Sequence, residues 1–200
     1  MARVQADELS GFPRRFRGLQ FQAMRGTCED HRRVLAACDN YLETFPRHEA
    51  EGTGMLFIGT PGTGKTTMAC ALSQAVRERY GIGVRYARAA DLVELAFDRA
   101  RSQDNYRAVE TADLLVLDEL GAEGSHEFPA RVLTAVLDRR YADQRPTILV
   151  SNLPDLPGET PTLWEHLGAP LSDRVKATMQ TLGCAWGSLR HGATGGRNGR

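Results

Sequence analysis

Four short apolar runs lie in the middle of the chain, and each is continuous rather than alternating with polar residues. They are Met55–Ile58, Val84–Ala87, Leu114–Leu117 and Thr147–Val150. Continuous apolar runs of this length are typical of strands that are buried on both faces of a parallel sheet. The sequence therefore predicts a parallel sheet with helices on both sides.

Helical periodicity separates these runs. Apolar residues recur at three- and four-residue spacing over 65–80, 91–101 and 129–141, and an earlier helix is expected over 27–45. Gly81 follows the first of these as a C-cap, and Pro129 stands at a favoured first helical position. Strands that alternate with helices form right-handed βαβ crossovers, so we expect a three-layer α/β domain.

The segments around this core are predicted from capping and composition. Thr27 is the expected N-cap of the 27–45 helix, with Asp30 close to a capping box, and Pro46 is expected to end that helix before a loop over 47–54. We divide the chain into a short Arg-containing extension (1–26), a core (27–157), a stretch of short helical pieces (158–190) and a Gly-rich tail (191–200).

The most specific chemical signal is a phosphate loop. Residues 59–66 read GTPGTGKT and match G-x-x-x-x-G-K-[ST], between a buried strand and an amphipathic helix. Glycines let backbone N–H groups face an anion, and the helix N-terminus adds partial positive charge. Lys65 is expected at the β- and γ-phosphates, and the Thr66 hydroxyl at Mg²⁺. The expected nucleotide-binding residues are Gly59, Thr60, Pro61, Gly62, Thr63, Gly64, Lys65, Thr66 and Thr67.

Polar residues follow two of the apolar runs. Asp118 and Glu119 end the 114–117 run, and Ser151 and Asn152 end the 147–150 run. The carboxyl edge of a parallel sheet is where ligands bind. We expect Asp118 to hold Mg²⁺, Glu119 to orient and deprotonate the attacking water, and Asn152 to bond the γ-phosphate.

Composition limits the class of partner. The 200 residues carry 25 basic and 25 acidic side chains, so no global field draws the chain to nucleic acid, and any such contact needs a local patch. All the basic residues are arginines except Lys65 and Lys176. The four cysteines form no metal-ligand pattern and are expected to be reduced and buried. With no membrane span and no apolar signal region, we expect a cytoplasmic protein.

These motifs in this order resemble AAA+ ATPases, and more closely the DnaC-type helicase loaders and IstB-type transposition helpers. The resemblance covers about residues 13–190. Besides the phosphate loop it rests on the segments PRRFR (13–17), LLVLDELG (114–121), DRRY (138–141), PTILVSN (146–152) and LSDRV (171–175), and on the 27–45 helix. It implies a P-loop three-layer sandwich with a small C-terminal helical lid over 158–190, and a Mg²⁺-dependent ATPase.

The resemblance also implies a nucleotide site completed by a second subunit. Arg174 matches the family's arginine finger, which acts on a neighbour's ATP, and Arg190 matches the second sensor arginine. A replicative helicase or a transposase is the implied partner. The region around Ala90–Arg101 matches the loaders' single-stranded DNA contacts. The arginines in or near that region are Arg85, Arg88, Arg99, Arg101 and Arg107, interleaved with acidic residues that favour a solvated helix face instead.

Three functions remain open on the sequence. The first is an ATP-hydrolysing protein that acts in DNA replication as a DnaC-like loader, or as an IstB-like transposition helper. The second is a small-molecule P-loop kinase, which the phosphate loop and the chain length allow. The third is a nucleotide-dependent interaction switch with weak turnover. The Asp118–Glu119 pair suits activation of water, which favours the first of these.

Overall fold

A computed structural model describes residues 11–124, 127–158 and 161–189. Its helices are α1 (Glu29–Glu43), α2 (Phe45–Glu51), α3 (Lys65–Tyr80), α4 (Ala89–Phe97), α5 (Arg99–Thr111), α6 (Glu127–Ala142) and α7 (Leu163–Thr178), with two 3₁₀ turns, η1 (Arg14–Phe16) and η2 (Phe21–Ala23). Its strands are β1 (Gly54–Gly59), β2 (Val84–Arg88), β3 (Leu114–Leu120), β4 (Thr147–Ser151) and β5 (Met179–Cys184). No helix in these ranges is long and apolar enough to cross a membrane.

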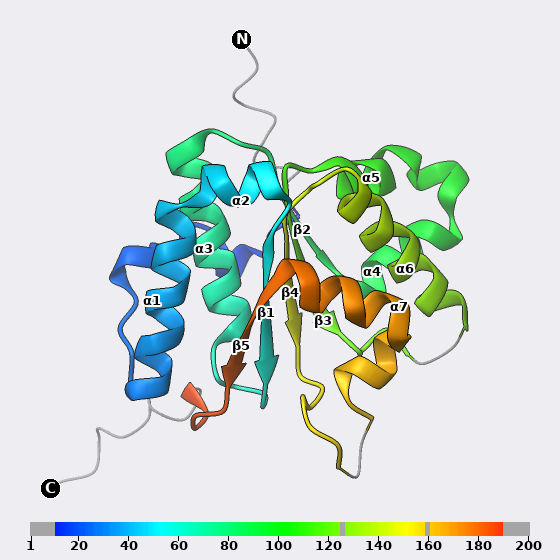
Figure 1. Cartoon of the computed structure of the whole chain (residues 1–200). Coiled ribbons are helices and arrows are strands. Elements are labelled where there is room, and N and C mark those ends of the chain that lie inside the picture. The colour runs from blue at the N-terminus through cyan, green and yellow to red at the C-terminus, as the bar shows by residue number, and fades with distance from the viewer. Residues whose placement is uncertain (1–10, 125–126, 159–160, 190–200) are drawn as a thin grey trace, which may run out of the picture.

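The five strands form one parallel sheet in the order β2-β3-β4-β1-β5. Helices α1 and α3 cover one face and α4 to α7 cover the other (Figure 1). Alternate residues of a strand point to opposite faces, and both sets are buried: Met55 and Phe57 pack toward α1 and α3, while Leu56 and Ile58 pack toward the other helices. The predicted three-layer sandwich is confirmed, and two buried faces explain why the apolar runs are continuous.

The start of α1 differs from the prediction by one residue. The N-cap is Cys28, not Thr27, and its Sγ accepts a hydrogen bond from the backbone N–H of His31 at 3.5 Å. Pro46 does not lead into a loop, because it occupies the first turn of α2, where its missing N–H costs no hydrogen bond. The predicted loop over 47–54 is therefore wrong as far as Glu51, and Gly52 ends α2 in the left-handed conformation.

Helix α5 and strand β5 were not predicted as separate elements. The expected 91–101 helix is divided into α4 and α5, which meet at Asp98. The stretch expected to hold only helical pieces contains α7 and then β5, which pairs with β1 along its whole length. β5 is hard to recognise in the sequence because only Leu182 and Cys184 in it are buried, and its other side chains are exposed or partly exposed. The division of the chain into a core and a C-terminal lid remains a prediction.

A buried arginine joins three elements behind the sheet. Arg140 of α6 is 1% exposed, and its guanidinium donates to the carbonyl oxygens of Val109, Glu110 and Ala112 at the end of α5. It also donates to the carbonyl of Pro146 and to the hydroxyl of Thr147 at the start of β4, at 2.7 and 2.9 Å. Carbonyls at a helix end have no partner within the helix, so this guanidinium serves as their cap.

The edge of the sheet near Asp118 is irregular. The pairing of β3 with β4 shifts between Leu117 and Leu120, so that three steps on β3 oppose two on β4. Glu119 lies in this bulge with a φ of 58°, which is unusual for a residue with a side chain. The exposed Glu119 side chain therefore leaves the regular alternation of the strand, while Asp118 stays buried.

Arg140 can be tested by a change that keeps its charge. We expect Arg140→Lys to lower the free energy of unfolding by about 2–3 kcal/mol, because an ammonium cannot reach five acceptors arranged around a planar fork. Urea unfolding measures this. The control is Arg139→Lys, because the neighbouring Arg139 is exposed and, among the described residues, pairs only with Asp143 across one helical turn. Its expected effect is within about 0.5 kcal/mol, and an equal loss in both variants would contradict the capping role.

The strain at Glu119 predicts an unusual order of stability. Glycine normally destabilises relative to alanine, but at a positive φ only glycine is free of the clash with Cβ. We expect Glu119→Gly to be more stable than Glu119→Ala by about 1 kcal/mol in thermal unfolding. The same pair at Glu94, an exposed position inside α4, should give the opposite order. The same order at both positions would argue against the strained backbone.

Candidate functional site

The phosphate loop joins β1 to α3 at the carboxyl end of the sheet. Gly59, Gly62 and Gly64 all have positive φ, at 140°, 88° and 88°. A Cβ on Gly59 would lie 2.3 Å from the carbonyl oxygen of Cys184 on β5, and one on Gly62 would lie 2.4 Å from the Ser188 hydroxyl. Gly59 and Gly62 are required both by their conformation and by close packing against β5 and the segment that follows it.

The segment that follows β5 forms hydrogen bonds with the phosphate loop. The indole N–H of Trp186 donates to the carbonyl of Thr63 at 2.9 Å, and the backbone N–H of Leu189 donates to the carbonyl of Gly62 at 2.9 Å. Trp186 is buried and stacks on His31 of α1. The loop is thus fixed between α3, β5 and α1, which pre-organises its shape.

Lys65 lies inside the curve of the loop. Its side chain is 4% exposed, and Nζ donates to the carbonyl oxygens of Gly59 and Thr60 at 2.8 and 2.7 Å. Nζ also lies 3.5 Å from the hydroxyl of Thr63. A compact ammonium is therefore held where it can contact an anion that the loop surrounds.

The Asp118 carboxylate is the second fixed group. It is 2% exposed and accepts hydrogen bonds from Thr66 Oγ1 at 3.2 Å, from Tyr86 Oη at 2.8 Å and from the backbone N–H of Glu119 at 2.8 Å. Burial, together with the neighbouring carboxylate, raises the pKa of Tyr86, so this phenol stays protonated and donates. Tyr86 thus fixes one carboxylate oxygen while the other faces Thr66.

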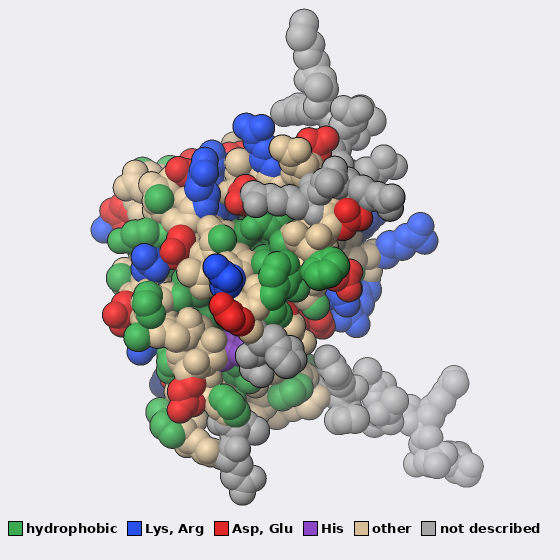
Figure 2. Space-filling view, turned by 90° about the vertical axis from the view of Figure 1, so that its right-hand side faces the viewer, with side chains coloured by type: hydrophobic (Ala, Val, Ile, Leu, Met, Phe, Trp, Pro, Cys, Tyr) green, Lys and Arg blue, Asp and Glu red, His purple; other side chains and the backbone are tan. Residues whose placement is uncertain are grey.

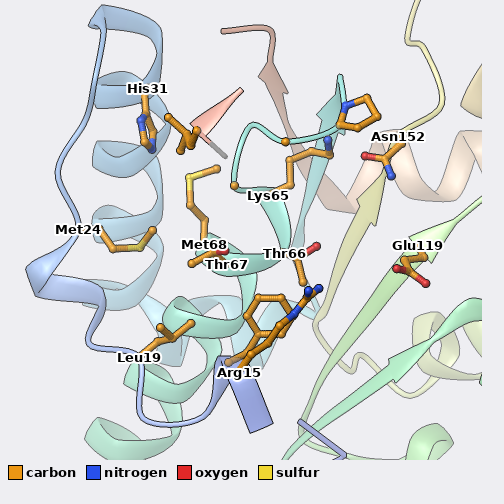
Figure 3. Close-up of a pocket in the computed structure, with 15 residues that line it drawn as sticks. Arg15, Leu19, Met24, His31, Lys65, Thr66, Thr67, Met68, Glu119 and Asn152 are labelled. Atoms are coloured by element: carbon orange, nitrogen blue, oxygen red, sulfur yellow. The ribbon is translucent and has the colours of Figure 1, made fainter. Parts of the chain in front are cut away.

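These groups open on one cavity of about 460 Å³. Figure 3 shows Lys65, Thr66, Glu119 and Asn152 around one side of it, and Leu19, Met24, His31 and Met68 around the other. Glu119 and Asn152 are both exposed, so their side chains can reach a ligand, whereas Ser151 is buried and donates to the carbonyl of Leu120. The cavity has one half suited to charged oxygens and one half suited to an apolar ring.

The cavity brings together most of the residues that the motifs predicted. Those lining it are Pro61, Gly62, Gly64, Lys65, Thr66, Thr67, Glu119 and Asn152; Gly59, Thr60, Thr63 and Asp118 lie directly behind them through the contacts above. Arg174 does not line it. It lies on α7, where Nη1 is 2.7 Å from Asp138 Oδ1 of α6 and the guanidinium lies 5.8 Å from the ring of Tyr141. Arg190 lies outside the described residues.

Three residues at the site were missed by the motif reading. Tyr86 lies within the apolar 84–87 run, but it pairs with Val116 and so faces the same side as Asp118, two residues after Val116. His31 and Arg15 come from segments without a recognised phosphate motif, and both line the cavity. Figure 3 shows Arg15 extending from η1 toward Thr66. The pairing of β2 with β3 would have identified Tyr86, but strand order cannot be derived from the sequence alone.

The arginines expected to contact DNA differ in their side-chain partners and in their exposure. Arg88 donates to both oxygens of Asp91, and Arg85 donates to the side chain of Asn105 at 3.2 Å. Burial lowers the pKa of Arg85. Arg107 is exposed, and the side chains of Arg99 and Arg101 lie outside the described part of the chain. Figure 2 shows the face covered by α4 to α7, where acidic and basic side chains are interspersed around a group of hydrophobic ones.

Known proteins share this architecture. The crystal structure of the DnaC helicase loader superposes with a TM-score of 0.76 at 23% identity, over 86% of this chain and 99% of that one. The crystal structure of DnaI gives a TM-score of 0.72 at 15% identity, over 92% and 99%. The replication initiator DnaA bound to AMPPCP and single-stranded DNA gives 0.66 at 17% identity, over 82% and 49%. These likenesses establish the AAA+ P-loop fold.

Sequence comparison adds the family. The replicative helicase loader DnaC of Escherichia coli K12 is 26% identical over 171 residues, which are 83% of this chain and 64% of DnaC. An uncharacterized protein of the same organism, YdaV, is 28% identical over 137 residues, or 67% of this chain and 52% of that protein. This chain thus spans less than two thirds of the length of either. The family model of IstB-like ATP binding proteins matches residues 29–176, and the chain belongs to that family.

Proposed function

We propose that this protein binds and hydrolyses ATP and acts in DNA replication as a helicase loader similar to DnaC. The observation that carries the proposal is the meeting of the phosphate loop with the β3 strand end. Thr66 Oγ1 and Asp118 Oδ1 lie 3.2 Å apart, at a cavity that Lys65, Glu119 and Asn152 also reach. Hydrolysis of a nucleoside triphosphate needs the groups that meet at this edge of the sheet: a phosphate loop, two carboxylates and an amide.

The residues present fit a magnesium nucleotide. A hydroxyl and a buried carboxylate oxygen are hard ligands of the kind that Mg²⁺ prefers, and Tyr86 holds the other carboxylate oxygen away from them. The described residues contain no group of three or more His, Cys, Asp or Glu that would hold a metal by themselves. Thr66 and Asp118 would therefore hold an ion that also binds phosphate and water. That ion would offset the negative charge of the β- and γ-phosphate oxygens.

The remaining groups have distinct parts in hydrolysis. Lys65 gives up its contacts with the carbonyls of Gly59 and Thr60 and binds the β- and γ-phosphates, with the backbone N–H groups of the loop around them. Asn152 bonds the γ-phosphate. Glu119, which lines the cavity and is exposed, orients a water in line with the γ-phosphorus and takes its proton as the oxygen attacks. The bond from the γ-phosphorus to the β-phosphate oxygen breaks in the same reaction, so that ADP and phosphate leave. Glu119 is exposed whereas Asp118 is buried, which supports separate roles for the two carboxylates.

The arginine finger is proposed to act between subunits. Arg174 lies on α7, is 36% exposed and does not line the cavity of its own chain. It can therefore contribute to hydrolysis only at the cavity of a second copy. Its ion pair with Asp138 holds the guanidinium beside α6 until that contact forms. Arg190 is proposed as the second sensor on the strength of the resemblance alone.

Two classes of partner are proposed. Likeness to the replicative helicase loader DnaC supports a replicative helicase as the partner. A contact with single-stranded DNA is proposed from the resemblance of the region around Ala90–Arg101 to the loaders. Membership of the IstB-like family supports a second candidate, a transposition helper that acts with a transposase. A small-molecule kinase would need a phosphate acceptor, so release of phosphate in an assay without any added acceptor would argue against that function. A pull-down with Glu119→Gln and ATP separates the first two partners.

Two substitutions test the site. We expect Lys65→Ala to lower ATP affinity by more than about 100-fold, because the loop loses its only ammonium, and Glu119→Gln to bind ATP like the unaltered protein but to lose about 100-fold or more in turnover. Nucleotide-binding titrations and phosphate release without an acceptor measure the two effects. Undiminished turnover in Glu119→Gln would remove Glu119 as the base.

The shared site can be tested by mixing inactive variants. Arg174→Ala subunits retain Glu119, and Glu119→Gln subunits retain Arg174, so mixed interfaces regain one complete site. We expect turnover in the mixture to exceed that of either variant alone, with ATP-dependent self-association seen by light scattering. Lack of recovery in a mixture whose assembly is confirmed would contradict an arginine finger supplied in trans.

A further inference from the structure

One buried polar atom beside the cavity has no hydrogen-bond partner in the described part of the chain. His31 is 2% exposed, and its Nε2 makes no hydrogen bond among the described residues. Leaving a buried donor or acceptor unsatisfied costs about 1–3 kcal/mol, so native structures rarely retain one without a reason. By contrast His48, on α2, has both ring nitrogens in contact with threonine hydroxyls, at 2.7 Å from Thr53 and 3.1 Å from Thr44.

The start of α1 determines which nitrogen of His31 carries the proton. The backbone N–H of Thr27 donates to Nδ1 at 3.2 Å, so Nδ1 must be an acceptor. Burial lowers the pKa of His31, which keeps the ring neutral at pH 7. A neutral imidazole with an accepting Nδ1 has its hydrogen on Nε2. The unpartnered atom is therefore a donor.

Stacking holds this ring in place. The imidazole lies 4.6 Å from the ring of Trp186, nearly parallel at 15°, and Trp186 donates in turn to the carbonyl of Thr63 in the phosphate loop. The orientation of His31 is thus fixed from both sides, by the first turn of α1 and by a residue bonded to the loop. A donor held this rigidly can discriminate between ligands.

The His31 side chain lies on the apolar side of the cavity. Figure 3 shows the imidazole projecting from α1 toward α3, on the same side as Met24, Met68 and Leu19. Lys65 and Glu119, two of the charged residues that line the site, lie on the other side. If phosphates occupy the loop, the part of the nucleotide that enters the apolar side is the base.

We infer that His31 reads the base of the bound nucleotide, with Nε2–H donating a hydrogen bond to a ring nitrogen of adenine. This inference rests on the proposed binding of ATP. The three pyridine-like nitrogens of adenine, N1, N3 and N7, are acceptors, and the thioethers of Met24 and Met68 provide soft apolar walls for the ring. Hydrogen-bonding sites of this kind reject analogues that lack the matching atom more strongly than apolar walls reject a change of shape.

The experiment replaces atoms on both sides of the contact. Binding of ATP, 1-deaza-ATP, 3-deaza-ATP and 7-deaza-ATP is measured for the unaltered protein, for His31→Phe and for the control His48→Phe. His31→Phe keeps a flat ring that can stack on Trp186 but removes the donor. The control loses a stacked histidine on α2 that does not line the cavity.

We expect the unaltered protein to bind one of the three deaza analogues about 5- to 10-fold more weakly than ATP. His31→Phe should lose about the same factor for ATP and no longer distinguish ATP from that analogue, whereas His48→Phe should behave like the unaltered protein. The inference is wrong if no deaza analogue binds more weakly, or if His31→Phe loses affinity equally for all four ligands.

The same titrations separate this inference from the proposed function. If the unaltered protein binds no ATP, both fail. If ATP binds and depends on Lys65, but the analogues and His31→Phe bind like ATP and the unaltered protein, nucleotide binding stands and base reading by His31 is overturned. The deaza analogues need no protein variant, so this result does not depend on whether His31→Phe folds.

Discussion

The carboxylate of Asp118 is almost fully buried, and the geometry of the site depends on how its charge is compensated. A buried carboxylate must be hydrogen-bonded, and the donors come from three different places in the chain: Thr66 at the start of α3, Tyr86 on β2 and the backbone of Glu119. These contacts fix α3 and β2 relative to the end of β3. They also determine which carboxylate oxygen faces the phosphate loop, and they place the next residue, Glu119, in the strained bulge.

The phosphate loop is held by a second set of contacts that reaches a different part of the chain. Close packing of Gly59 against the backbone of β5 leaves no room for a side chain, and Trp186 and Leu189 bond two carbonyls of the loop. Trp186 also stacks on His31, so the position of α1 and the shape of the loop are linked. The two halves of the cavity, one polar and one apolar, are therefore parts of one rigid arrangement, which favours a ligand that has both a phosphate chain and a ring.

Arg140 and Arg174 are two arginines whose surroundings give them different roles. Arg140 is enclosed and donates to five acceptors, so its charge is used to cap α5 and to fix β4. Arg174 is partly exposed and has one ion pair, which a competing anion on another molecule can replace. In a chain with 23 arginines, only the surroundings of each side chain separate a structural role from a proposed catalytic one.

The sequence by itself determined the parallel sheet, the phosphate loop and the strand-end residues Asp118, Glu119 and Asn152, because these depend on local patterns: continuous apolar runs, a fixed glycine spacing and the residues directly after a strand. It did not determine β5, the cap at Cys28 or the contributions of Tyr86, His31 and Trp186. A strand with few buried side chains leaves little apolar pattern, and the stacking of His31 on Trp186 joins an imidazole and an indole that lie 155 positions apart in the chain. Which residues meet across such distances depends on strand order and packing, and the tertiary structure alone decided them.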